Sequence, residues 1–327
     1  MDARQRYQAM PDALAAVDRP IVHSLCNWGV DQPWVWGRAR GQLWRTSPDI
    51  APVWATVLVN LESVADRAAY AGPGGWNDPD MLEVGVVRGG VQFNPDESRA
   101  HMGLWALVAS PLIAGNDVRD MPAEVRAILT HPEVIAIDQD PWGLAAVRIP
   151  RNAKTEIWTR PLRQRGLRAV GLFNRDIVPR TITVSWAEIG LADAPASVRD
   201  LWADEERGAF DTGYEAEVPP HGLVLITVRG LDAEPAAGEH ALSDLRWMYA
   251  ANALGPAERD MSNGGRALGD GAPISLAGVS YPRGVGVRAS SRILVPLGGR
   301  CTSFRALAGL EDGVNNDADS CPDTSNA

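Results

Sequence analysis

The carboxylates best suited to chemistry lie in two short segments that contain Gly or Pro. Residues 72–81 read Gly-Pro-Gly-Gly-Trp-Asn-Asp-Pro-Asp-Met, and residues 43–50 read Leu-Trp-Arg-Thr-Ser-Pro-Asp-Ile. Gly and Pro define a sharp, specific backbone path. Carboxylate oxygens accept hydrogen bonds from hydroxyl groups, and an aromatic face covers an apolar ring surface. Together these residue types indicate a site for a sugar.

Three candidate residues, two in these segments and one in a neighbouring segment, could also have purely structural roles. Asp49 could cap the amino terminus of a following helix. Arg45, four residues earlier, could form an ordinary surface ion pair. Trp28 follows an apolar strand-like run and could be a core side chain at a strand end. The residue types alone leave both readings open.

The elements that would position these residues alternate between helix and short apolar run over residues 1–145. Such alternation predicts a parallel sheet with crossover connections. About four βα units fit here, whereas a closed (β/α)8 barrel needs eight units and roughly 250 residues. The periodicity predicts helices over residues 4–17, 49–71, 97–114 and 117–129, and strands over residues 21–25, 81–84 and 134–137.

The chain changes character after residue 145. Short β-rich runs follow each other closely in residues 146–230, which predicts a small antiparallel β-sandwich. Residues 231–241 are polar and contain Ala and Pro, as expected of a linker. Residues 242–327 form a third unit.

Composition excludes several functions. The chain has 327 residues and a net charge of −10, which argues against a nucleic-acid partner. It has no apolar run of about 18 residues, so no membrane span is expected. The three cysteines, Cys26, Cys301 and Cys321, give neither a self-contained disulfide framework nor zinc-ligand spacing. We expect no metal and no cofactor.

Residues 24–29, Ser-Leu-Cys-Asn-Trp-Gly, complete a pattern with the first two segments. In this order the three resemble the family 27 glycoside hydrolases, whose commonest members are α-galactosidases (melibiases). The resemblance implies an α/β fold, the C-terminal half of a (β/α)8 barrel over residues 1–145, followed by an antiparallel β-domain. Residues 242 to about 313 resemble an NPCBM-type (family 51) carbohydrate-binding module, here a truncated β-sandwich.

The resemblance also implies roles for individual residues. Asp49 matches the family's acid/base in a retaining cleavage of terminal α-galactosyl groups. The family's nucleophile is an Asp in a Lys-x-Asp-x-Cys motif, which this sequence lacks, and Cys26 matches the cysteine that pairs with that motif. We therefore expect a fragment that is inactive alone. The expected sugar contacts are Trp28, Arg45, Asp80, Met81 and Asn27.

Alternatives follow from one departure. Asn27 stands where the family usually has Glu, at the position facing the 2-substituent of the sugar, so the scaffold could serve a β-L-arabinopyranosidase or an α-N-acetylgalactosaminidase. A non-catalytic carbohydrate-binding fragment is a further alternative. The expected partner is an α-galactoside oligosaccharide or polysaccharide, and the intact parent is expected to be extracellular.

Overall fold

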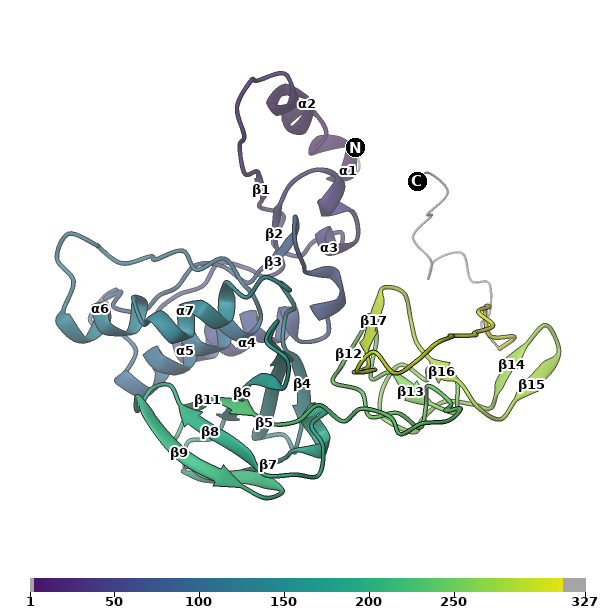
Figure 1. Cartoon of the computed structure of the whole chain (residues 1–327). Helices are drawn as coiled ribbons and strands as arrows, with labels where there is room; N and C mark the ends of the chain where they lie inside the picture. The colour runs from purple at the N-terminus through teal and green to yellow at the C-terminus, as the bar shows by residue number, and fades with distance from the viewer. Residues whose placement is uncertain (1–2, 314–327) are drawn as a thin grey trace.

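The first unit of the protein is an open segment of parallel sheet flanked by helices (Figure 1). The computed structural model describes residues 3–313. Strands β1 (Ser24–Leu25), β2 (Leu43–Arg45) and β3 (Trp76–Asp78) pair in the order β1-β2-β3. Both pairings are parallel, and a parallel bridge between Leu82 and Ala114 continues this arrangement along the chain. The connections are those of barrel-type βα units.

Helices connect and cover these strands. The longest, α5, begins with Pro95 at its first turn, after an Asn94–Glu97 capping box that satisfies two backbone N–H groups. Its buried face joins the core of the β-domain that follows. The helices of this unit are α1 (Ala3–Arg6), α2 (Ala9–Ala15), α3 (Pro33–Trp36), α4 (Trp54–Ala65), α5 (Pro95–Leu107), α6 (Ala123–Leu129) and α7 (Pro132–Asp138), with 3-10 turns at Gly37–Ala39 and Ala68–Tyr70.

Three expectations for this unit were wrong in detail. The strand expected over residues 134–137 is helix α7, in which Val134 and Ile137 are buried one helical turn apart. The helix expected over residues 4–17 is two short helices, α1 and α2. The strand expected over residues 81–84 is reduced to the single bridge at Leu82.

The second unit is the predicted antiparallel sandwich. A six-stranded sheet in the order β4-β5-β6-β11-β8-β9 lies against the β7–β10 pair, and buried Trp186 and Val184 contribute to the core between them. A second core joins this unit to α4 and α5 of the first unit. The strands are β4 (Val147–Pro150), β5 (Thr155–Pro161), β6 (Leu167–Asn174), β7 (Arg180–Ser185), β8 (Ala196–Asp200), β9 (Glu205–Phe210), β10 (Gly213–Val218) and β11 (Leu223–Arg229), with a 3-10 turn at Ala187–Ile189.

The third unit consists of three antiparallel strand pairs, β12–β17, β13–β16 and β14–β15. The predicted class, an α/β barrel segment followed by β-sandwich units, is confirmed. Residues 314–327 of the predicted module lie outside the described residues. Among the residues described, no helix has the length and apolarity to cross a membrane. The strands are β12 (Tyr249–Asn252), β13 (Glu258–Arg259), β14 (Ile274–Leu276), β15 (Val279–Tyr281), β16 (Val285–Gly286) and β17 (Ser291–Leu294).

Candidate active site

The segments that follow the three parallel strands meet at one edge of the first unit. Trp28 comes three residues after β1, Asp49 four residues after β2 and Asp80 two residues after β3. Because the strands are parallel, these carboxyl-terminal loops emerge at the same end, where barrel enzymes build their sites. Direct contacts link all three loops.

Asp49 is an exposed carboxylate held by two donors. Its Oδ1 accepts hydrogen bonds from Trp28 Nε1 at 3.1 Å and from Arg45 Nη2 at 3.1 Å. Its side chain is nevertheless 74% exposed. Helix α4 begins at Trp54 with Val53 at the N-cap, so Asp49 is not the cap of that helix. The carboxyl group is thus oriented by the protein and open to a ligand.

Arg45 is buried at the centre of the site. Besides Asp49, its Nη2 lies 2.8 Å from Asp80 Oδ2 and donates to the Pro48 carbonyl at 2.9 Å. Its Nη1 is 4.0 Å from Cys26 Sγ. Because the Arg45 side chain is buried, it does not form the ordinary surface ion pair that the sequence left open. Arg45 instead joins the loops that follow β2 and β3.

Asp80 is also buried, with its side chain 6% exposed, and both of its oxygens have protein partners. Oδ2 accepts from the Ile50 backbone N–H at 2.8 Å in addition to Arg45, and Oδ1 accepts from the N–H of Met81 at 2.8 Å. Asp78 Oδ1 in turn accepts from the Asp80 N–H at 2.8 Å. Asp80 therefore fixes the loop geometry, and its expected sugar contact remains a prediction.

The remaining expected contacts line the same edge. Trp28 is 55% exposed, so it is not a core residue at the end of the strand. Its loop passes close to the next one: Gly29 has φ +78°, and an ideal Cβ there would lie 2.3 Å from the Thr46 carbonyl oxygen. Met81 is 39% exposed. Asn27 donates its side-chain N–H to the Val30 carbonyl.

Two residues of α5 make hydrogen bonds to the backbone of the loop that carries Asp80. In the sequence, only their helical spacing indicated that they are buried. Trp105 Nε1 donates to the Asp80 carbonyl at 2.7 Å. His101 Nε2 accepts from the Glu83 N–H at 3.1 Å, and its ring packs against Trp105 with centroids 4.1 Å apart. Complete burial lowers the pKa of His101 to about 3. The imidazole is therefore neutral and acts as an acceptor.

Because His101 is buried, we expect the free energy of unfolding to decrease at acidic pH. Its folded pKa lies below its unfolded value of 6.5, so the unfolded state binds the extra proton first. The stabilising contribution is complete above pH 6.5 and declines as the pH falls towards 3, by up to about 1.4 kcal/mol per pH unit.

Unfolding followed by tryptophan fluorescence between pH 7 and 4 tests this. His101→Gln keeps a neutral acceptor and should flatten the pH dependence, whereas His240→Gln, at an exposed histidine, should leave it unchanged. Equal slopes in wild type and His101→Gln would contradict the prediction.

Metal ligands do not gather in this part of the structure. Within residues 3–313, no group of three or more His, Cys, Asp or Glu side chains is placed to hold a metal ion. The thiols of Cys26 and Cys301 are free and exposed, and Cys321 lies outside the described residues. The site therefore presents an oriented carboxyl group beside an exposed indole.

Comparison with protein families agrees with a barrel segment followed by a β-sandwich. Residues 1–140 match the family described as Alpha galactosidase A, and residues 152–228 match the Alpha galactosidase C-terminal beta sandwich domain. Residues 238–321 match the NPCBM/NEW2 domain. Residues 1–228 are thus similar to family 27 α-galactosidases, and an NPCBM match follows them.

Individual relatives support this assignment. A probable alpha-galactosidase of Dictyostelium discoideum is 43% identical over 230 residues, which cover 69% of this chain and 58% of the relative. Alpha-galactosidase 3 of Arabidopsis thaliana is 44% identical, covering 66% and 50%. The crystal structure of α-galactosidase I from Mortierella vinacea superposes with a TM-score of 0.64 at 31% identity, covering 70% and 64%. The chain spans about half the length of the curated relatives it matches.

Proposed function

We propose that this chain supplies the acid/base part of an α-galactosidase site, with Asp49 as the proton donor. The observation that carries the proposal is the carboxyl group of Asp49, which two side chains orient and solvent reaches. Such a group can protonate the departing glycosidic oxygen and then activate the water that completes the reaction. Trp28 offers an apolar face beside it for the sugar ring.

A retaining mechanism also needs a nucleophilic carboxylate about 5–5.5 Å from the acid/base. Asp80 shares Arg45 with Asp49, but its oxygens are engaged by backbone N–H groups and by that arginine. A carboxylate so held is poorly placed to attack a sugar. We propose that the nucleophile belongs to a segment that is not part of these 327 residues.

The substrate class is proposed from the family and from the site. A solved yeast α-galactosidase with raffinose, 27% identical, has the same fold with a TM-score of 0.60. The uncharged amide of Asn27, at the expected 2-substituent position, bears on a second candidate, an α-N-acetylgalactosaminidase, whose sugar carries an acetamido group there. β-L-Arabinopyranose keeps the 2-hydroxyl of galactose and lacks its C6 group, so a β-L-arabinopyranosidase is supported by structural likeness alone. A family 27 β-L-arabinopyranosidase from Geobacillus stearothermophilus superposes with a TM-score of 0.65 at 27% identity. We further propose that the parent protein acts outside the cell.

The experiment compares this chain with a chimera in which the amino-terminal part of the Dictyostelium relative precedes residue 1. On nitrophenyl α-galactoside, the 327-residue chain alone should give no turnover above an Asp49→Ala control. The chimera should give turnover that depends on Asp49. Turnover by the chain alone would overturn the proposed origin of the nucleophile. A panel including nitrophenyl β-L-arabinopyranoside and α-N-acetylgalactosaminide would identify the sugar.

A further inference from the structure

The first strand of the module is buried against the first unit of the protein. Tyr249, at the start of β12, is 2% exposed. Its hydroxyl donates to the Ala145 carbonyl at 2.8 Å, so its one polar atom is satisfied. Small side chains leave room for the ring at this junction. The cluster contains Ala68, Ala71, Ala109, Leu144, Ala145, Tyr249 and Ala251.

This contact lies at the opposite end of the parallel strands from Asp49. Ala68 belongs to the 3-10 turn at Ala68–Tyr70, and Ala71 lies five residues before β3 begins at Trp76. Arg292 of β17 also approaches the same segment, because an ideal Cβ on Gly72 would lie 3.7 Å from its guanidinium nitrogens. The described part of the module, up to residue 313, therefore contacts the amino-terminal end of the sheet, opposite the edge that carries Asp49.

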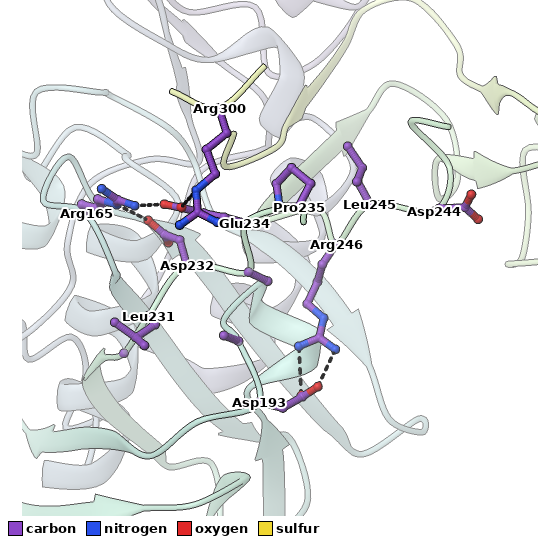
Figure 2. A pocket seen from close by; sticks show the side chains of 13 residues that line it. Arg165, Asp193, Leu231, Asp232, Glu234, Pro235, Asp244, Leu245, Arg246 and Arg300 are labelled. Atoms are coloured by element: carbon purple, nitrogen blue, oxygen red, sulfur yellow. Dashed lines mark hydrogen bonds and ion pairs between the residues drawn. The ribbon is translucent and has the colours of Figure 1, made fainter. Parts of the chain in front are cut away.

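A second contact joins the module to the β-domain. Arg246 donates to both oxygens of Asp193, at 3.0 and 3.1 Å (Figure 2). It also donates to the Leu191 carbonyl at 2.8 Å. Next to it the backbones nearly touch. Gly190 has φ +71°, and an ideal Cβ there would lie 2.3 Å from Met248 Cα. A side chain at residue 190 would push the module away.

The linker also forms ion pairs with both units. Glu234 pairs with Arg165 of the β-domain, and its Oε2 lies 3.6 Å from Nε of Arg300 of the module (Figure 2). Asp232 pairs with Arg168 at 2.7 Å, and both side chains are buried. These pairs border a cleft of about 850 Å³ between the two units. The docking surface thus has an apolar anchor at Tyr249 and ionic contacts around the cleft.

We propose that the module is a fixed part of this protein, docked through Tyr249 onto the amino-terminal end of the parallel sheet, and that this docking persists when the linker is cut. The module's own β12 strand is therefore the partner that occupies this surface of the first two units.

A protease site inserted between Gly238 and Glu239, in the exposed part of the linker, tests the proposal on the full chain. After cleavage, the two pieces should elute together in size-exclusion chromatography at 1 μM protein and 0.15 M NaCl. In Tyr249→Ala the pieces should separate, with an affinity lowered by about 30-fold, as expected for a buried aromatic anchor. Arg246→Ala should weaken association less, and mainly at low salt.

Two controls distinguish docking from damage to the module. Tyr249→Phe keeps the ring and should stay associated, and Phe304→Ala removes an exposed aromatic of the same module and should have no effect. Circular dichroism of the released module would show whether Tyr249→Ala still folds. Separation of the wild-type pieces after cleavage would overturn the proposal, as would full association of Tyr249→Ala. Neither outcome depends on catalytic activity, so the test is independent of the proposed function.

Discussion

Replacing Asp49 with alanine in the chimera should lower kcat/KM for melibiose-type substrates by about 10²- to 10⁴-fold. This is the usual contribution of one general acid–base group. The side chain is mostly exposed and serves no helix cap, so its removal leaves the fold intact. The loss should therefore come from proton transfer to the leaving oxygen and not from unfolding.

The leaving group provides a sharper test of the same assignment. Activated aryl α-galactosides need little protonation, so Asp49→Ala should retain their glycosylation step and accumulate the glycosyl intermediate. Azide should then restore turnover, because a small anion needs no general base. Asp96→Ala, which removes a half-exposed carboxylate of α5, is the matched control. Near-normal turnover of melibiose by Asp49→Ala would remove Asp49 from the mechanism.

The sequence predicted the organisation of this site better than its internal contacts. The order of the three motif segments was enough to bring Trp28, Asp49 and Asp80 to one edge, because parallel strands present their carboxyl ends together. It did not reveal that Arg45 and Asp80 are buried partners. That arrangement depends on the loop path, in which Asp80 adopts φ +84°. Local residue types do not specify such a path.

The incorrect element assignments have a similar origin. Val134-Ile135-Ala136-Ile137 is a short apolar run, and such a run fits a strand or a buried helix equally well. Pro132 near the helix start and the packing of Val134 and Ile137 decide for α7. The docking of the module was not predicted either, because residues 231–241 have the composition of a flexible linker. The docking depends on contacts between residues far apart in the sequence.

The second large effect is expected at Asp80. Asp80→Ala should lower the free energy of unfolding by about 3–5 kcal/mol, because it leaves the buried Arg45 guanidinium without its closest carboxylate. The Ile50 and Met81 N–H groups would lose their acceptor at the same time. Denaturant unfolding of the 327-residue chain, followed by tryptophan fluorescence, measures the change.

Asp49→Ala is the matched control, since it removes the other carboxylate on the same arginine. Its side chain is 74% exposed, against 6% for Asp80, and exposed ion pairs contribute only about 0–1 kcal/mol. The two variants should thus separate the functions of the two carboxylates: Asp80→Ala chiefly destabilises the fold, and Asp49→Ala chiefly removes activity from the chimera. Equal destabilisation by both would show that Asp80 is no more an anchor than Asp49. In that case its expected contact with the sugar would become the better explanation of its place in the loop.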